Sequence, residues 1–248
     1  MNPAARVLVV GAAGKMGKAV QDAAGGRADV RIAGTIDQGD DVAAALAQCD
    51  VYVDFSTPTA TLAVARAAIA AKRAAIIGTT GLAGDAETIF GELAQVAPVV
   101  VAANFSLGVN LMLGLVRQAA RALGPAWDAE VVETHHQAKR DAPSGTALAI
   151  ARAIAAGHGA DYDAVKRHAR DGDIGPRPRG EIGVATVRGG DVVGEHVAYF
   201  FGDHERIEIA HRATSRGIFA TGALVAAAWV VGKPPGRYTM LDVLGLPS

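Results

Sequence analysis

The first hundred residues alternate short apolar runs typical of β-strands with alanine-rich runs of helical length. Strands are expected at 6–11, 30–37, 51–56, 74–80 and 98–104, and helices at 18–25, 58–72 and 85–95. This alternation predicts stacked βαβ units built around a parallel sheet. The strands are nearly continuous apolar runs, as expected when helices cover both faces of the sheet. We therefore expect a Rossmann-like, doubly wound α/β domain.

The pattern changes after Phe105. A helix at 109–123 precedes a strand at 129–135, and a second helix runs from Ser144 to about Ala156. A polar loop at 168–180 then leads to three strand-like runs at 182–190, 194–202 and 205–214. Consecutive strands without intervening helices predict a smaller α+β domain with a mixed or antiparallel sheet. A last, strongly apolar helix is expected to begin near Arg216.

Composition excludes several classes of protein. The chain has 248 residues, of which 50% are hydrophobic and 20% charged, and its net charge of −1 gives no reason to expect a nucleic-acid partner. The most apolar stretch, 222–232, is too short to span a bilayer, and the first residues lack a signal-peptide pattern. Cys49 is the only cysteine, so no internal disulfide can form. We expect a soluble cytoplasmic protein with no membrane or nucleic-acid partner.

A glycine loop, GAAGKMG, follows the first expected strand. Gly11, Gly14 and Gly17 form GxxGxxG, a variant of the dinucleotide fingerprint, in which a tight turn brings a pyrophosphate close to the N–H groups of a helix start. The second strand ends in Asp37, an acidic residue placed to accept hydrogen bonds from an adenosine ribose. The alternative is a merely tight turn in another α/β fold. We expect NADH or NADPH as the cofactor.

The residue after Asp37 modestly favours NADH over NADPH as the expected cofactor. Sites selective for NADPH often place an arginine here to hold the 2′-phosphate, whereas this chain has Gln38. An uncompensated aspartate repels that phosphate. Lys15, within the glycine loop, could offset part of the repulsion.

Two further strand ends belong to the same expected crevice. They are GTTG at 78–81 and AANFS at 102–106. Ligands of doubly wound sheets lie beyond the carboxyl ends of the strands, and small or hydroxylated residues there let a nicotinamide ribose approach the backbone. For GTTG, an ordinary strand-to-helix turn is an equal alternative.

The segment ETHHQAKRDAPSGTAL, at 133–148, contains adjacent histidines. A metal site is disfavoured, since neighbouring side chains at a strand end point to opposite sides and no cysteine or HExxH pattern completes a ligand set. The alternative is that one of the two histidines is structural and the other is solvated. However, Lys139 follows closely, and Asp141 or Ser144 can cap the helix that begins there. Such a helix start, with a lysine and an imidazole beside it, suits a small dianion and a proton donor.

The sequence resembles the 4-hydroxy-tetrahydrodipicolinate reductase (dihydrodipicolinate reductase) family. The segment EVVETHHQAKRDAPSGTA carries the resemblance, together with GAAGKMG, DFSTP, GTTG, AANFSLGVN, ATVRGGDVVGEH and TSRGIFATGAL. These motifs stand in the family's order and cover nearly the whole chain. The resemblance implies hydride transfer from a nicotinamide cofactor to a cyclic, unsaturated imine dicarboxylate in the diaminopimelate route to lysine.

The resemblance also implies site residues. His135 would be the catalytic proton donor and Lys139 would assist protonation, while His136 would contact the substrate. Gly145 and Thr146 would hold a substrate carboxylate. The remaining candidates are Ser144 and Arg216 for the substrate, and Gly11, Ala12, Ala13, Gly14, Lys15, Met16, Asp37, Gly78, Thr79, Thr80, Ala102, Ala103, Asn104 and Phe105 for the cofactor.

The family's architecture implies a dinucleotide-binding domain at 1–106 and 217–248, with a substrate-binding and oligomerisation domain at 107–216. It also implies a homotetramer assembled through strands within 182–213. Three alternatives stay open: another two-domain NAD(P)-dependent dehydrogenase of an amino or keto acid, a dinucleotide sensor without turnover, and a paralogue with a shifted substrate. His196, His204 and His211 are expected to be structural or interfacial, and Trp127 and Trp229 to lie in a core or interface.

Overall fold

The structure is a computed structural model that describes residues 3–247. It divides into two compact units. Unit 1 holds the described residues up to Leu107 and from Gly217 onward, and unit 2 holds Gly108–Arg216. Among the described residues, no helix is both long and apolar enough to cross a membrane.

Unit 1 contains a parallel sheet with six strands. In spatial order they are β11 (Gly236–Tyr238), β5 (Pro98–Val101), β4 (Ala74–Ile77), β3 (Val51–Asp54), β1 (Ala5–Val10) and β2 (Val30–Ile36). Its helices are α1 (Lys15–Ala24), α2 (Val42–Ala47), α3 (Pro58–Ala71), α4 (Ala86–Val96), α8 (Gly217–Val230) and α9 (Met240–Leu244). The expected Rossmann-like fold class is confirmed.

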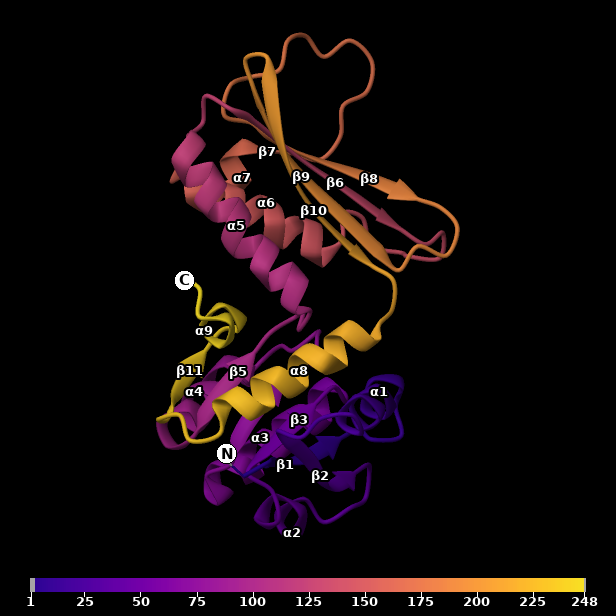
Figure 1. Cartoon of the computed structure of the whole chain (residues 1–248), viewed down its shortest axis with the longest axis vertical. Helices are drawn as coiled ribbons and strands as arrows, with labels where there is room; N and C mark the ends of the chain where they lie inside the picture. Colours follow the sequence, from indigo (N-terminus) through magenta and orange to yellow (C-terminus); the bar gives the residue numbers. More distant parts are fainter. Residues whose placement is uncertain (1–2, 248) are drawn as a thin grey trace. The chain divides into compact units, whose positions relative to one another are not determined.

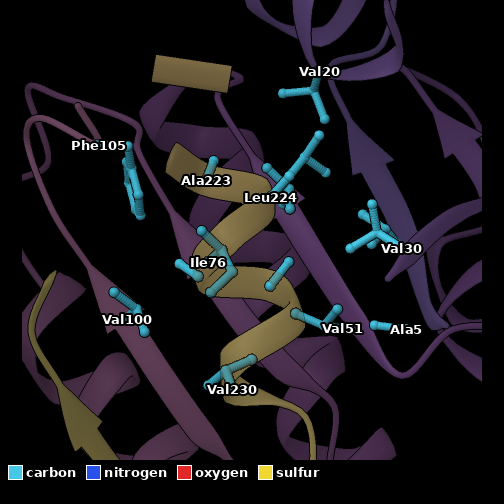
Figure 2. Packing of buried hydrophobic residues seen from close by; sticks show 14 of the residues in the cluster. Ala5, Val20, Val30, Val51, Ile76, Val100, Phe105, Ala223, Leu224 and Val230 are labelled. Carbon is cyan, nitrogen blue, oxygen red and sulfur yellow. The ribbon is translucent and has the colours of Figure 1, made fainter. Parts of the chain in front are cut away.

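Helices cover both faces of this sheet. One core cluster joins α1 and α8 to the strands, and Figure 2 shows Ile76 and Val100 of the sheet beside Leu224 and Val230 of α8. A second cluster packs α2, α3 and α4 against the opposite face. α8 is apolar on all sides, so its sequence does not show which face it buries. At Gly222 a side chain would collide with the carbonyl of Phe105, so glycine is required for this close approach.

Three elements of unit 1 were not predicted from the sequence. β11 has only three residues, α9 has five and α2 has six. Runs this short carry no readable periodicity. β11 is placed by pairing in parallel with β5, which extends the sheet by one strand.

Unit 2 contains the expected mixed sheet, which has five strands where the sequence predicted four. In spatial order they are β10 (Glu205–Ala213), β9 (Gly194–Gly202), β6 (Asp128–His135), β8 (Ile182–Arg188) and β7 (Lys166–Arg167). Its helices are α5 (Leu107–Leu123), whose first residue still belongs to unit 1, α6 (Gly145–His158) and α7 (Tyr162–Val165). β8 and β9 follow each other in the chain but are not neighbours, because β6 lies between them, parallel to β8 and antiparallel to β9.

The helices of unit 2 lie on one side of its sheet (Figure 1). A single core cluster includes Met112 and Val116 of α5, Ile150 and Ile154 of α6, and the alternate strand residues that face them. The strand pattern is strict on β6 and β9, where every second residue is buried. The pleat therefore assigns one face of β6 to the helices, and that face includes the end of the strand at His135.

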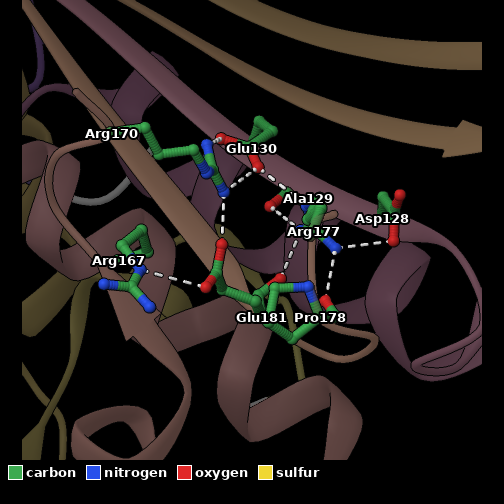
Figure 3. A network of polar contacts seen from close by, with 8 residues as sticks. All are labelled: Asp128, Ala129, Glu130, Arg167, Arg170, Arg177, Pro178 and Glu181. Carbon is green, nitrogen blue, oxygen red and sulfur yellow. Dashed lines mark hydrogen bonds and ion pairs between the residues drawn. The ribbon is translucent and has the colours of Figure 1, made fainter. Parts of the chain in front are cut away.

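An arginine-rich network fastens the 168–181 segment to the sheet of unit 2. Arg177 donates hydrogen bonds to Asp128 (2.6 Å) and Glu130 (3.0 Å), and also to three backbone carbonyls (Figure 3). Arg170 joins Glu130 to Glu181. The polar composition of this segment predicted a surface loop, which it is, but not these anchors.

Candidate active site

A cavity of about 650 Å³ lies beyond the carboxyl ends of β1, β2 and β3 in unit 1. Its lining comes from the glycine loop, the end of β2, the segment after β3 and the start of α3, and includes Gly11, Gly14, Asp37, Gln38, Asp40, Ser56, Thr57, Thr59 and Ala60. This is the end of a parallel sheet at which dinucleotides bind. Gly11, Gly14 and Asp37, which the sequence analysis assigned to the cofactor, are among the lining residues.

The glycine loop has the geometry that a pyrophosphate requires. Gly11 has φ +73°, a backbone conformation that favours glycine, and a side chain there would come within 3.0 Å of Ser56 Cβ. A side chain at Gly17 would collide with the backbone of Gly11 and Ala12, so glycine allows α1 to pack against the turn. Gly14 is the N-cap of α1 and gives it no side-chain cap. The helix start can therefore receive an anionic group.

Asp37 is exposed at the end of β2 and faces the glycine loop. Its carboxylate accepts a hydrogen bond from the Ala13 N–H at 3.0 Å. Asp40 lies beside it, because the Asp40 carboxylate accepts from the Asp37 N–H at 2.8 Å. Two carboxylates therefore stand beside the glycine loop at the end of β2, and Gln38, between them in sequence, adds no positive charge. The residues present fit a nicotinamide dinucleotide.

The other predicted cofactor residues lie elsewhere in unit 1. Lys15 is exposed and Met16 half-buried at the start of α1. Gly78, Thr79 and Thr80 follow β4, and Ala102, Ala103, Asn104 and Phe105 follow β5. Among the described residues, neither of these two segments lines the cavity.

Several of these side chains have structural partners. A side chain at Gly78 would collide with the Phe55 ring, and the Phe105 ring packs edge-on against Phe55 within the core. Thr79 is buried, and its hydroxyl accepts from Thr61 at 2.7 Å and donates to Asp54 at 3.3 Å. For Thr79 and Phe105, contact with a cofactor would therefore involve the backbone.

Asp54 was not singled out from the sequence, although it opens the DFSTP motif. It is fully buried at the end of β3, and its Oδ1 accepts from the Ser56 N–H at 2.8 Å. Burial raises the pKa of this carboxyl. Through Ser56 and Thr79, Asp54 connects the cavity wall to the segment after β4.

In unit 2, the strand register gathers polar side chains around His135. His135 and Glu133 are two residues apart on β6, so they share the face that the helices cover. Glu133 pairs with Thr186 of β8 and with His196 of β9. Arg188 pairs with His135 at the end of β8. Polar residues that are far apart in the sequence thus meet at one end of the sheet.

Glu133 is the centre of this cluster and is fully buried. Its carboxylate contacts His135 Nδ1 and accepts hydrogen bonds from both terminal nitrogens of Arg188 (2.9 Å each) and from the Ser144 N–H (3.0 Å). Burial opposes ionisation, but these donors hold the pKa of Glu133 below its usual range. The sequence analysis missed Glu133 and Arg188. The usable signal for Glu133 was its two-residue spacing from His135 on an alternating strand.

His135 is buried, with 8% of its surface exposed. Burial lowers the pKa of its imidazole, and the hydrogen bond to Glu133 opposes that shift. The ring packs edge-on against His196, with centroids 5.2 Å apart. His196 is buried as well, and its Nε2 lies 3.1 Å from Ser144 Oγ. Burial and the neighbouring His135 lower the pKa of His196 to about 4.

The other predicted substrate residues lie around this cluster. His136 is half-buried just after β6, and Lys139 Nζ lies 3.0 Å from the exposed carboxylate of Asp141. Ser144, rather than Asp141, caps α6, because its hydroxyl accepts from the Ala147 N–H at 3.1 Å. Gly145 is exposed as the first residue of α6, and Thr146 follows it. Arg216 is exposed immediately before α8.

The structure also places the remaining histidines and tryptophans that the sequence analysis named. His204 has φ +65° at the turn between β9 and β10, and His211 is half-buried on β10. A side chain at Gly202 would come within 2.7 Å of the Trp127 ring. Trp229 packs edge-on against Tyr238. Within residues 3–247 there is no group of three potential metal-ligating side chains.

Unit 1 is Rossmann-like and has a cavity where dinucleotides bind, and unit 2 is an α+β unit with a buried histidine–carboxylate pair. These features are those of a two-domain NAD(P)-dependent oxidoreductase. The family of the protein follows from its similarity to known sequences. Residues 5–105 match the family model described as dihydrodipicolinate reductase, N-terminus, and residues 108–244 match dihydrodipicolinate reductase, C-terminus. The chain belongs to the dihydrodipicolinate reductase family.

Curated relatives match over nearly their whole length. A 4-hydroxy-tetrahydrodipicolinate reductase from Anaeromyxobacter dehalogenans is 47% identical, with 97% of this chain and 98% of that protein covered. One from Caulobacter vibrioides is 45% identical, with 99% of each covered. A third, from Akkermansia muciniphila, is 44% identical, with 97% of this chain and 98% of that protein covered.

Solved structures share the fold. The dipicolinate-bound dihydrodipicolinate reductase from Paenisporosarcina sp. TG-14 has a TM-score of 0.77 and 22% identity, with 96% of this chain and 98% of that chain covered. GenD2 from gentamicin A biosynthesis, in complex with NAD, has a TM-score of 0.61 and 14% identity, with 98% and 91% covered. At these identities the likeness concerns the fold alone.

Proposed function

We propose that the protein catalyses the NAD(P)H-dependent reduction of 4-hydroxy-tetrahydrodipicolinate, via dihydrodipicolinate, to tetrahydrodipicolinate in the diaminopimelate route to lysine. The observation that carries the proposal is full-length similarity, at 40–47% identity, to curated proteins named for this reaction. The chemistry of unit 2 supports it, because a buried imidazole and a lysine lie beside the exposed start of α6. This arrangement suits a small dianionic substrate that must be protonated.

In this reaction the bound nicotinamide supplies a hydride to one carbon of the carbon–carbon double bond. The neighbouring carbon then takes a proton, and we assign its delivery to His135. Lys139 supports protonation and attracts a substrate carboxylate, with His136 as a further contact. The N–H groups of Gly145 and Thr146, at the positive end of α6, hold a carboxylate, and Ser144 fixes that helix start. Arg216 is a further candidate for a carboxylate contact.

The cofactor would be bound in unit 1 by the residues around the cavity. Gly11 to Met16 would hold the pyrophosphate, and Asp37 the adenosine ribose. Gly78 to Thr80 and Ala102 to Phe105 would contact the nicotinamide half, chiefly through the backbone. The support for these assignments is the glycine-loop geometry, which suits a pyrophosphate.

We expect NADH to be preferred modestly over NADPH. Asp37 and Asp40 place two carboxylates at the ribose, where a 2′-phosphate would be repelled, and Gln38 cannot neutralise it. Replacing Gln38 with arginine should raise the ratio of NADPH to NADH affinity by roughly tenfold, about 1.4 kcal/mol. Fluorescence titration of both cofactors in the two proteins would measure that ratio. An unchanged ratio would remove Gln38 from the explanation.

We further propose a cytoplasmic homotetramer that forms through the sheet of unit 2. The sheet face opposite the helices exposes Val187 (47%) and Phe201 (38%), and Phe201 stacks with Tyr199. A partner subunit covering this face would bury these apolar side chains. Light scattering coupled to gel filtration gives the mass directly, and a monomer at micromolar concentration would contradict the tetramer.

The first experiment is a reconstituted assay. Aspartate semialdehyde, pyruvate and a dihydrodipicolinate synthase are mixed, the protein is added with NADH or NADPH, and loss of nicotinamide absorbance is followed. Oxidation that requires the complete mixture supports the reductase, and His135→Gln should lower kcat by about 10²-fold or more while leaving NADH affinity intact. Cofactor binding without oxidation would instead favour a dinucleotide sensor or a paralogue with another substrate.

A further inference from the structure

The buried carboxylate of Glu133 has donors around both of its oxygens. Oε1 accepts from the Ser144 N–H, from Thr186 Oγ1 at 3.2 Å and from Arg188. Oε2 accepts from the other terminal nitrogen of Arg188 and contacts His135 Nδ1. A guanidinium, a backbone N–H and a threonine hydroxyl facing an oxygen can all donate, so the site is built for an ionised carboxylate.

An ionised carboxylate can only accept hydrogen bonds. The contact with His135 therefore requires that Nδ1 carry a hydrogen, both in the neutral ring and in the imidazolium. Nε2 is then the one ring atom whose protonation state can change. Among the described residues, no hydrogen bond to His135 Nε2 is formed, so this atom has no competing protein partner.

At Gly194 the neighbouring strand presents no side chain to the Nε2 edge of the ring. Gly194, the first residue of β9, has no side chain, and a methyl group there would lie 2.9 Å from Nε2 and 3.3 Å from Cδ2 of His135. Such distances are shorter than a van der Waals contact, so any side chain at this position would displace the ring. Arg188 also donates to the Asp141 carbonyl at 2.6 Å, which links the cluster to the segment that carries Lys139.

We propose that Glu133, held in place by Arg188, is a positioning residue that keeps His135 in the Nδ1-protonated tautomer and thereby makes Nε2 the atom that delivers the proton. This inference rests on the proposed function for the identity of the reaction, but not for the tautomer. Glu133 also compensates the imidazolium charge, so loss of its charge leaves a proton donor that is harder to protonate. The groups facing His135 are Glu133 on β6, Arg188 on β8, His196 on β9 and Lys139 in the following loop.

The decisive variant is Glu133→Gln, which keeps the shape and removes the charge. Its carbonyl oxygen would turn to Arg188, and its amide N–H₂ would face Nδ1, which must then accept. We expect the neutral His135 ring to switch to the Nε2-protonated tautomer. We also expect kcat to fall by about 10²-fold or more, and the alkaline side of the kcat–pH profile, where the proton donor loses its proton, to move to lower pH. Affinity for NADH should stay within about twofold, because Glu133 is not in unit 1.

The matched control is Glu130→Gln. It removes a carboxylate from the same strand, but on the opposite face of the sheet, where Glu130 pairs with Arg170 and Arg177. This variant should retain the wild-type tautomer and pH profile. Glu133→Asp, which keeps the charge with a shorter side chain, should recover part of kcat relative to Glu133→Gln.

Nitrogen-15 NMR of the histidine rings reports the tautomer without any turnover. A wild-type His135 that is protonated on Nδ1 and switches in Glu133→Gln supports the inference, even if the reductase assay fails. A neutral wild-type ring protonated on Nε2 overturns it, and that measurement does not depend on whether the variant folds. A reductase-active wild type whose Glu133→Gln variant keeps kcat and the pH profile also overturns it.

Discussion

At the scale of single residues, His196 has the most strongly lowered histidine pKa in the described chain, at about 4. The unfolded chain binds the proton near pH 6.5, so the folded state favours neutral His196 relative to the unfolded state. Its contribution to stability is complete above about pH 6.5 and is lost as pH falls toward 4. A pKa shift of this size corresponds to a change of as much as about 3 kcal/mol in the free energy of unfolding. Urea unfolding at several pH values within this window would measure the loss.

The variant His196→Gln isolates this contribution. His135, His158 and His211 have lowered pKa values too, so the wild-type slope of stability against pH contains several groups. The slope between about pH 6.5 and 5 should become shallower in His196→Gln. It should stay unchanged in His204→Asn, which alters an exposed turn residue. Identical slopes in all three proteins would show that His196 titrates normally.

Residue-scale prediction from the sequence succeeded where the signal was local. Ser144 was one of two predicted caps for α6, because a hydroxyl before Gly-Thr-Ala is a local helix-start signal. Glu133 was missed because its environment is not local. Arg188 and Thr186 are more than fifty positions away in the sequence, and only the pairing of β6 with β8 brings them to the carboxylate.

At the scale of elements, the 168–181 segment has no helix or long strand of its own, so its order depends on arginine anchors. Arg177 bonds Asp128, Glu130 and the Ala129 carbonyl, all at the start of β6. Replacing Arg177 with methionine should loosen the segment while unit 2 stays folded, because Glu130 keeps Arg170 and Asp128 is 43% exposed. Amide hydrogens within 168–180 should exchange about tenfold faster, roughly 1.4 kcal/mol of opening free energy.

Hydrogen–deuterium exchange with mass spectrometry measures this opening segment by segment. Arg179→Gln is the matched control, since Arg179 is exposed in the same segment and, among the described residues, does not share the hydrogen bonds by which Arg177 holds Asp128, Glu130 and the Ala129 carbonyl. Exchange in α6 should be unaffected in both variants. Unchanged exchange at 168–180 in Arg177→Met would show that the fold of the segment does not depend on this anchor.

The elements themselves were predictable to different extents. The strands and helices of the first hundred residues follow a clear alternation, and only the short α2 lay outside the predicted set. The spatial order of β8, β6 and β9 was not predictable. Sequence periodicity identifies a strand and its buried face, but pairing between strands depends on contacts across the whole unit.

At the scale of the whole molecule, the chain leaves unit 1 after Leu107 and returns to it at Gly217. The returning helix α8 contributes Ala220, Ala223, Leu224, Ala227 and Val230 to the core on one face of the parallel sheet. Sequence patterns could not show this, because a helix that is apolar on all sides fits any core. Only the family resemblance implied the return of α8.

Unit 1 should therefore fold only when both of its segments are present. Residues 1–107 alone would expose the sheet face that α8 covers, and each large apolar side chain left uncovered costs about 1.5–3 kcal/mol. We expect this fragment to lack cooperative unfolding.

A chain that joins residues 1–107 to 217–248 through a flexible glycine–serine linker should unfold cooperatively and bind NADH, as followed by circular dichroism and cofactor fluorescence. In the joined chain, Gly222→Val should abolish both, because a side chain at Gly222 collides with the Phe105 carbonyl. Cooperative folding of residues 1–107 alone would show that the sheet does not need α8.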